Sequence, residues 1–269
     1  MPYPIYQVDA FNESLFSGNP AAVVPLNAWL GDETLQAIAA ENNLSETAFI
    51  VPSDDEGLDY DIRWMTPTSE VKLCGHATLA TAHVLFEHLG FSRDTIRLGS
   101  MSGELVVTRD EESRIVLDFP EIEITPSEPT PELIEGLGAT PSAVFDSYDL
   151  ICVFESEAQL RALDPDFRAL LKVPNVRAIG VTAPGESCDF VARLFAPAVG
   201  IDEDPVTGSL YTMLTPYWAK RLGKSTMRAR QISERTGDLV VNVSDSAPGR
   251  VRIAGHAVSY MKGEIYTSP

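Results

Sequence analysis

Residues 73–90, LCGHATLATAHVLFEHLG, place reactive side chains at the start of an almost uncharged helical run. Cys74, Gly75 and His76 come first, and the apolar residues that follow lie around most of the circumference of a helix over Thr78–Leu89. A helix that is apolar nearly all round is buried, so we expect strands to wrap around it. The stretch therefore predicts a central helix whose N-terminus carries a thiol and an imidazole.

A second stretch repeats this arrangement in the later half of the chain. The strand-like DIRWMTP (61–67) precedes the first helical run, and the strand-like FVARLFAP (190–197) precedes a second run over Ser209–Leu222. Matching residues keep a nearly constant spacing, namely Arg63 to Arg193 and Pro67 to Pro197 (193 − 63 = 197 − 67 = 130), Gly75 to Gly208 and Gly90 to Gly223 (208 − 75 = 223 − 90 = 133), and GELVV at 103–107 to GDLVV at 237–241 (237 − 103 = 134). The sequence therefore contains two copies of one unit.

The repeat predicts an α+β protein of two similar domains. We assign residues 1–119 to an N-terminal domain, the Pro- and Glu-rich residues 120–136 to a linker, and residues 137–269 to a C-terminal domain. A further helix is expected at 28–43, on the outside of the first domain. Pro216 is expected to kink the second central helix or to remove one of its hydrogen bonds, because proline lacks the backbone N–H that a helix interior requires.

The composition limits the classes of function. Among 269 residues 39 are acidic and 20 are basic, a formal net charge of −19, which disfavours binding to nucleic acid. No run approaches the roughly 20 apolar residues of a membrane span and the first residues lack a signal-peptide pattern, so we expect a cytoplasmic protein without membrane association. Three cysteines without a C-x-x-C pair indicate neither a disulfide framework nor a structural zinc site.

The two helix starts are candidate anion sites. The first turn of a helix has unpaired N–H groups and about half a positive charge, and glycine lets a ligand approach the backbone closely. Gly75 and Gly208 would place two such starts across a cleft between the domains, as a pocket for carboxylate groups. His76 and Ser209 follow these glycines at matching positions and could exchange a proton with a bound group. Each glycine alone is also typical of a turn before a helix.

Carboxylates present in one copy only are candidate bases. Glu46 precedes a strand of the first copy, whereas the position 130 residues later is Val176 (46 + 130 = 176). Asp204 lies in the loop before the second helix and has no acidic counterpart in the first copy. Glu46 is also typical of a turn or capping residue, and residues 202–204 of a solvated acidic loop.

Four motifs in order resemble the phenazine-biosynthesis isomerase family, the PhzF-like branch of the diaminopimelate epimerase fold. The motifs are DAFNESLFSGNPAAVV (9–24), NLSETAFI (43–50), CGHATLATA (74–82) and EDPVTGS (203–209). The resemblance implies two similar domains, each a β-barrel-like sheet around a central helix, with an active site in the cleft. It also implies proton-shift chemistry without a cofactor or a metal, and family members are often homodimers.

The resemblance also assigns roles to residues. It gives Glu46 the acid–base role and maps the family's other catalytic groups onto His76, Asp204 and Ser209. The expected substrate-binding residues are Asn19, Cys74, Gly75, Thr207 and Gly208. For a base that also returns its proton near neutral pH, we expect burial to raise the pKa of Glu46.

Cys74 departs from the phenazine-forming enzyme, which has alanine there, and matches the place where related epimerases carry a catalytic thiol. The second copy has no thiol before Gly208, so a symmetrical mechanism with two thiols is not expected. The leading hypothesis is an isomerase acting on a small carboxylate-bearing substrate. The alternatives are an epimerase with Cys74 and either Glu46 or Asp204 as its bases, and a binding protein without turnover. A metal site of Cys74, His76 and Glu46 would lack a clear fourth ligand.

Overall fold

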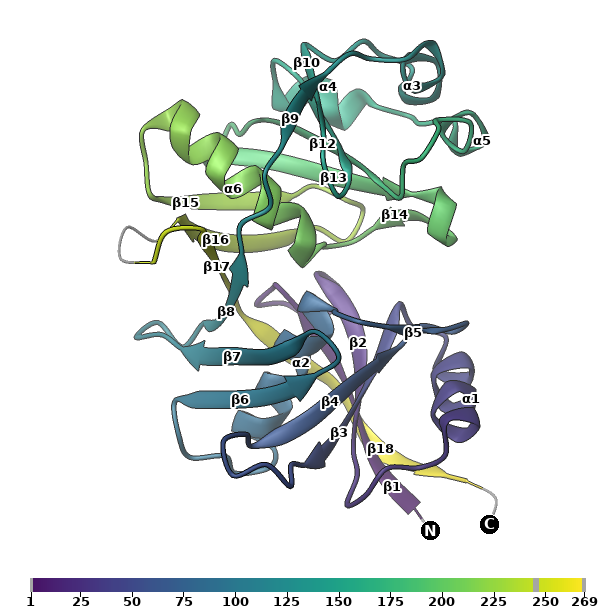
Figure 1. Ribbon diagram of the computed structural model, residues 1–269, viewed down its shortest axis with the longest axis vertical. Helices are drawn as coiled ribbons and strands as arrows, with labels where there is room; N and C mark the ends of the chain where they lie inside the picture. Colours follow the sequence, from purple (N-terminus) through teal and green to yellow (C-terminus); the bar gives the residue numbers. More distant parts are fainter. Residues whose placement is uncertain (1, 244–246, 268–269) are drawn as a thin grey trace. The chain divides into compact units, whose positions relative to one another are not determined.

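The computed structural model describes residues 2–243 and 247–267. The chain forms two compact units, one of Met1–Asp118 with Ala254–Pro269 and one of Phe119–Ile253. In each unit a sheet surrounds one helix, α2 in the first and α6 in the second (Figure 1). The predicted α+β fold of two similar units is confirmed. No helix in residues 2–243 and 247–267 is both long enough and apolar enough to cross a membrane.

The first unit has a sheet in the order β18-β1-β2-β3-β4-β6-β7-β8, with β5 added to the end of β4. The pairs β2/β3 and β4/β6 are parallel, and the others are antiparallel. The strands are β1 (Pro2–Ala10), β2 (Asn19–Pro25), β3 (Glu46–Pro52), β4 (Tyr60–Met65), β5 (Glu70–Val71), β6 (Thr95–Ser100), β7 (Gly103–Arg109), β8 (Ile115–Pro120) and β18 (Ala257–Tyr266).

Helix α2 (Gly75–Glu87) is the central helix of the first unit. It begins three residues before the predicted start at Thr78, and nearly all of its first ten residues are buried. Two threonines fit this apolar setting because their hydroxyls donate to carbonyls of the preceding turn: Thr78 to Cys74 at 2.5 Å and Thr81 to Ala77 at 2.8 Å. The predicted burial of this helix is confirmed.

Helix α1 (Asp32–Asn42) is shorter than the predicted helix at 28–43. Its buried residues Leu35 and Ala39 pack against a cluster that includes Phe49 of β3 and Val24 of β2. This cluster is separate from the residues that surround α2, so α1 covers the outside of the unit as predicted.

The second unit repeats the plan of the first, with strands in the order β9-β10-β11-β12-β13-β15-β16 and β14 added to β13. Again one early pair, β11/β12, and one later pair, β13/β15, are parallel. The strands are β9 (Thr125–Ser127), β10 (Ala143–Asp146), β11 (Leu150–Val153), β12 (Ile179–Pro184), β13 (Phe190–Ala196), β14 (Ile201–Asp204), β15 (Thr226–Gln231), β16 (Gly237–Val243) and β17 (Arg250–Gly255), and a 3₁₀ turn η1 (Pro197–Val199) precedes β14.

Helix α6 (Gly208–Leu222) is the central helix of the second unit and continues through Pro216. Proline cannot donate to the carbonyl four residues earlier, which is that of Thr212. The backbone N–H of Ile122 donates to this carbonyl instead, at 3.2 Å. The defect that the sequence predicts is therefore satisfied by a neighbouring segment of the same unit.

The same ion pair recurs in both units. Arg63 of β4 makes two hydrogen bonds of 2.7 Å to Glu70 of β5, and Arg193 of β13 makes bonds of 2.8 and 2.9 Å to Glu203 of β14. The two glutamates are 133 positions apart (203 − 70 = 133), the spacing already found for the helix starts. The repeat therefore extends to the side-chain interactions that hold β5 and β14.

Two domain boundaries differ from the prediction. The last 16 residues, 254–269, belong to the first unit and not to the C-terminal one, because β18 pairs with β1 along Pro2–Ala10. The segment 120–136 is part of the second unit, since it contains β9 and most of α3 (Pro131–Leu137). Leu133 of α3 packs with α4 (Glu157–Ala162) and α5 (Phe167–Leu170) in one apolar cluster.

Candidate active site

Glu46 and His76 meet at the start of α2 in the first unit. Glu46 is the first residue of β3, and His76 is the second residue of α2. The Nε2 atom of His76 lies 3.2 Å from Oε2 of Glu46, and their side chains are only 6% and 14% exposed. The carboxylate and the imidazole therefore form an ion pair that is almost shielded from water.

Asn19 and Cys74 complete this group around the other ring nitrogen. The side-chain amide of Asn19, the first residue of β2, lies 3.3 Å from Nδ1 of His76, and Sγ of Cys74 lies 3.5 Å from the same atom. Gly18 fixes the entry into β2, because its φ of +67° and a carbonyl 2.2 Å from where a Cβ would stand exclude other residues. The structure thus brings four of the predicted site residues together.

The pKa shifts give this group a defined charge state. Burial raises the pKa of Glu46, but the charge of His76 and hydrogen bonds with His76 and Cys74 outweigh burial, and the pKa lies below its ordinary value. Burial lowers the pKa of His76, but Cys74 and Glu46 outweigh it and raise the pKa well above the ordinary value. At neutral pH the pair is a carboxylate facing an imidazolium.

The expectation that burial raises the pKa of Glu46 is therefore wrong. Burial alone acts in that direction, but the imidazole 3.2 Å away contributes to a larger effect in the opposite direction. Cys74 behaves as burial predicts, since burial and the nearby Glu46 charge raise the pKa of its thiol to about 11. The thiol therefore keeps its proton at neutral pH, while Glu46 is ready to accept one.

The same three side chains are the candidate for a metal ion. One possible ligand atom from each of Glu46, Cys74 and His76 lies within 4.8 Å of the other two. Among residues 2–243 and 247–267, these three side chains are the group close enough together to hold a metal ion. Metal ligation requires a thiolate and a neutral imidazole. Without an ion the thiol pKa is about 11 and the imidazole pKa is raised, so a metal ion that binds here has to displace a proton from each of these two groups.

The start of α6 in the second unit has the same backbone and different side chains. Thr207 takes the place of Cys74, with φ and ψ of −118° and 101° against −143° and 111°, and neither side chain caps its helix. The Thr207 hydroxyl donates to the carboxylate of the buried Asp204 at the end of β14. Gly208 and Ser209 then open the helix, as Gly75 and His76 do in the first unit.

Gln231 is a site residue that the sequence prediction missed. Its side chain is fully buried at the end of β15, where it accepts from the backbone N–H of Thr207 at 3.0 Å and donates to the carbonyl of Asp204 at 2.8 Å. The missed signal is its phase in the strand: Met227 and Ala229 face inward at alternate positions, so Gln231 puts an amide where the pattern requires an apolar residue.

The strand registers also correct the counterpart of Glu46. Met65 faces Thr47 in the first unit, and its counterpart Phe195 faces Ile179 in the second (195 − 65 = 130, 179 − 47 = 132). The residue before Ile179 is the buried Ala178, so Glu46 corresponds to Ala178 and not to Val176. Val71 likewise corresponds to Asp204, since each follows the paired glutamate of its copy. Each carboxylate thus stands in one copy only.

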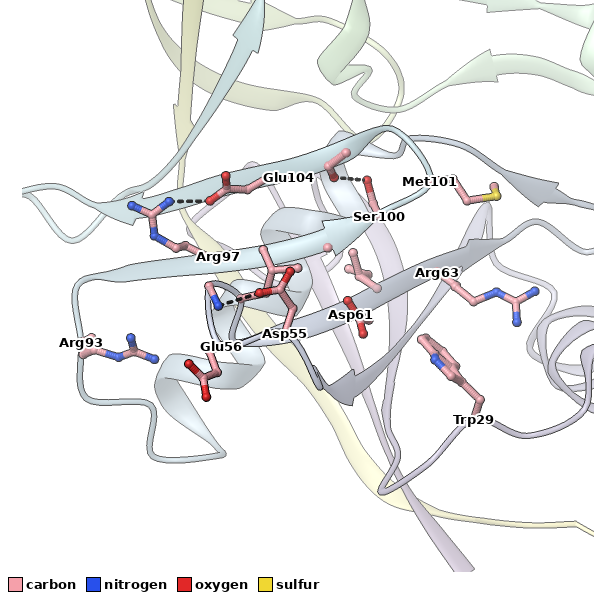
Figure 2. A pocket seen from close by; sticks show the side chains of 15 residues that line it. Trp29, Asp55, Glu56, Asp61, Arg63, Arg93, Arg97, Ser100, Met101 and Glu104 are labelled. Carbon is pink, nitrogen blue, oxygen red and sulfur yellow. Dashed lines mark hydrogen bonds and ion pairs between the residues drawn. The ribbon is translucent and has the colours of Figure 1, made fainter.

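A surface pocket elsewhere in the first unit offers no free positive charge for an anionic ligand. Figure 2 shows its lining, which includes Trp29, Arg63, Arg93 and Arg97 and none of the predicted site residues. Arg97 is paired with Glu104 at 2.5 Å, and the other two guanidinium groups are also in ion pairs, with Asp32, Glu70 and Asp59. The group around Glu46 is therefore the better candidate for a reaction.

Comparison with known proteins decides the family. A family model described as "Phenazine biosynthesis-like protein" matches residues 8–263. The chain belongs to this family. An uncharacterized isomerase of Pseudomonas aeruginosa is 50% identical over 269 residues, covering 100% of both chains. The crystal structure of a PhzF-family phenazine biosynthesis protein from Enterococcus faecalis matches with a TM-score of 0.94 and 46% identity, covering 99% of this chain and 100% of that one.

The PhzF fold extends to more distant proteins. A hydroxyproline epimerase from Agrobacterium vitis matches with a TM-score of 0.64 at 12% identity, over 98% of this chain and 92% of that one, which shows a shared fold alone. The family resemblance and the epimerase-like fold that the four motifs imply are therefore confirmed, and the chain is an enzyme of the isomerase class.

Proposed function

We propose that this PhzF-family enzyme moves a proton between carbons of a small carboxylate-bearing substrate, with Glu46 as the acid–base group. The ion pair between Glu46 and His76 carries the proposal. A buried carboxylate with a lowered pKa is unprotonated at neutral pH, which is the state that a base needs.

The reaction proceeds in two proton transfers. Glu46 takes a proton from a substrate carbon next to an unsaturated system, and the electron pair of the C–H bond moves into that system. Glu46, now a carboxylic acid, donates a proton to a second carbon as the electron pair moves back, and solvent hydrogen enters the product when the proton on Glu46 exchanges with water first. No co-reactant is consumed, because the substrate loses one proton and gains one, and the electron pair stays in the substrate.

His76 supports both transfers through its charge. As an imidazolium it stabilises the Glu46 carboxylate at rest, and it stabilises negative charge that develops on the substrate while Glu46 is neutral. The first-turn N–H groups beyond Gly75 supply further positive potential for a substrate carboxylate, which a chain with a net charge of −19 otherwise lacks. The proposal gives Asp204 and Ser209 a supporting part, which their substitution by Asn and Ala tests.

Hydrogen exchange tests the role of Glu46. The protein is incubated in D2O with a panel of unsaturated and amino carboxylates, and deuterium in the recovered compounds is measured by NMR and mass spectrometry. Glu46→Gln should lower the exchange rate by about 10³-fold or more, because it removes the group that carries the proton. Glu41→Gln, an exposed position in α1, is the matched control. Full exchange by Glu46→Gln would show that another group is the base.

Cys74 separates this proposal from an epimerase. Its sulfur lies next to His76, as an epimerase thiol would require, but a thiol pKa of about 11 leaves it protonated. Cys74→Ala should therefore retain most of the exchange activity. Loss of exchange in Cys74→Ala with retention in Glu46→Gln would instead support the epimerase, and binding without exchange across the panel would support a protein without turnover.

A further inference from the structure

Ser259 of β18 lies between two imidazoles at the C-terminal end of α2. Its Oγ atom is 2.9 Å from Nε2 of His83 and 2.6 Å from Nε2 of His88, and the three residues are half-buried. They are not among the residues grouped around Glu46, and they lie in none of the four motifs. A serine hydroxyl within hydrogen-bond distance of an imidazole is the arrangement of a nucleophile with its base.

A β-bulge in β18 places Ser259 at this point. Gln7 of β1 faces Met261. The next residue of β1, Val8, faces Ser259, so Tyr260 is the extra residue of the bulge. A bulge changes the direction of the side chains beside it and is common next to active sites. The strand therefore departs from regular pairing at the residue that meets both histidines.

The two distances assign the protons of this group. A hydroxyl has one proton, so Ser259 donates to one imidazole and accepts from the other. O–H donors form shorter hydrogen bonds than N–H donors, so the hydroxyl donates to His88 at 2.6 Å and accepts from His83 at 2.9 Å. Burial lowers the pKa of His83 to about 4, so its ring is neutral at pH 7 and carries one N–H. The base is therefore His88.

His88 is held in the position that a base requires. Its ring stacks on that of Tyr6, with centroids 4.9 Å apart. It is the C-cap residue of α2, and its backbone N–H donates to the carbonyl of Val84 at 2.9 Å. The negative potential at the C-terminal end of a helix stabilises a positive charge. An imidazolium that forms when His88 takes a proton is therefore stabilised by the helix.

A donor for developing negative charge lies close to the hydroxyl. When Oγ of Ser259 bonds to a carbonyl carbon, the carbonyl oxygen that becomes negative lies only one atom away from it. The Nε2–H group of His83, which already donates to Oγ, is close to that oxygen. The ammonium of Lys262, 5.6 Å from the centre of the Tyr6 ring, adds positive potential.

The surroundings favour a small apolar acyl group. Leu89 follows His88 along the chain and is 39% exposed, and the ring of Tyr6 covers one face of the imidazole. The net charge of −19 disfavours the approach of an anionic substrate. An uncharged ester with a small acyl group is therefore the class of substrate that fits this group.

We propose that Ser259 is a nucleophile that takes the acyl group of a small uncharged ester, with His88 as its base. Oγ forms a bond to the carbonyl carbon while its proton passes to Nε2 of His88. The bond between that carbon and the alcohol oxygen then breaks. The alcohol oxygen keeps the electron pair and takes the proton from His88, so one ester and one serine give an acyl-serine and an alcohol. The reaction does not involve Glu46.

Reaction with p-nitrophenyl acetate tests the nucleophile. The folded protein is mixed with this ester at pH 7, release of p-nitrophenol is followed by absorbance, and acetylated residues are identified by mass spectrometry of acid-quenched samples. We expect acetylation of Ser259 and a rate of release at least about tenfold lower in Ser259→Ala. Ser53→Ala is the matched control, because Ser53 is also half-buried but donates to the carboxylate of Asp61. Equal release by Ser259→Ala and the parent protein overturns the proposal.

A second substitution at the same position keeps the test independent of folding. Ser259→Cys retains a nucleophilic side chain and should be acetylated at position 259 by the same ester. Circular dichroism compares the fold of each variant with that of the parent protein. A folded Ser259→Cys protein without acetylation at this position also overturns the proposal.

His88→Asn tests the base. It removes the group that accepts the hydroxyl proton and should lower the rate of Ser259 acetylation by about 10²-fold. His256→Asn, which removes an imidazole that pairs with Glu13, should leave that rate unchanged. Equal acetylation of Ser259 in His88→Asn and the parent protein contradicts the assignment of His88 as the base.

Discussion

The starts of α2 and α6 share a backbone and differ in almost every side chain. In the first unit the start is charged, with the carboxylate of Glu46 3.2 Å from His76. In the second unit, Thr207 and Gln231 form a hydrogen-bonded network around Asp204. The repeat thus sets the position at which a helix begins inside each sheet. Single residues at that position determine whether it holds a charged pair or a hydrogen-bonded network. The proton transfer that we propose therefore belongs to the first unit.

Removing the imidazole of His76 should have the largest effect on the difference between the two units, because it changes the charge state of Glu46. In His76→Asn, the charge and hydrogen bond of His76 no longer oppose the burial of Glu46 and only the smaller effect of Cys74 remains, so the pKa of Glu46 rises and the carboxylate forms at higher pH. We expect deuterium exchange near neutral pH to fall by about 10²–10³-fold, with the acidic limb of the pH–rate profile shifted to higher pH.

His256→Asn is the control for this change, since the imidazole of His256 pairs with the exposed Glu13 and not with Glu46. An unchanged acidic limb in His76→Asn would contradict the assigned charge state. If the acidic limb of the pH–rate profile shifts and the rate of His76→Asn recovers fully at high pH, His76 acts only by lowering the pKa of Glu46.

Breaking the amide network should destabilise the second unit. Gln231→Leu leaves the N–H of Thr207 and the carbonyl of Asp204 without their partner, at about 1–3 kcal/mol for each buried group. We expect the free energy of unfolding in urea to fall by about 2–6 kcal/mol, the sum for the two groups. Ser100→Ala, at the matching strand position of the first unit, should lower it by less than about 1 kcal/mol. Equal effects would show that the network is not specific to α6.

The repeated arginines should show the smallest difference. Arg63 binds Glu70 and Asp32, whereas Arg193 binds Glu203 and also the carbonyls of two residues at the end of α4, both at 2.9 Å. Arg193→Met should therefore lower the free energy of unfolding by about 1–2 kcal/mol more than Arg63→Met. Equal losses would mean that the ion pair alone holds each arginine.

The repeat made most of the fold predictable from the sequence, because strands and buried helices follow from local residue patterns. The return of β18 to the first unit was not predictable in this way, since the partner of a strand far along the chain leaves no local signal. The counterpart of Glu46 was placed two residues early because the turn between β12 and β13 is shorter than that between β3 and β4.

The sequence predicts which residues lie together at the candidate site more fully than it predicts their pKa values. Spacing and motifs located Glu46, Cys74 and His76, but a pKa depends on distances that no spacing gives. Gln231 lies in none of the four motifs, and only its inward-facing position in β15 indicates that its amide is buried beside the start of α6.

Because β18 belongs to the first unit, one cut in the chain does not separate the two units. A fragment that ends at Asp118 lacks β18, so the backbone groups of Pro2–Ala10 that pair with β18 are left without their partners. Pro2 and Tyr266 are paired neighbours, and a short linker between them would allow a circularly permuted gene to begin at Ala254 and end at Asp118. That rearranged gene encodes the whole first unit as one continuous polypeptide, whereas the N-terminal half of the sequence lacks β18.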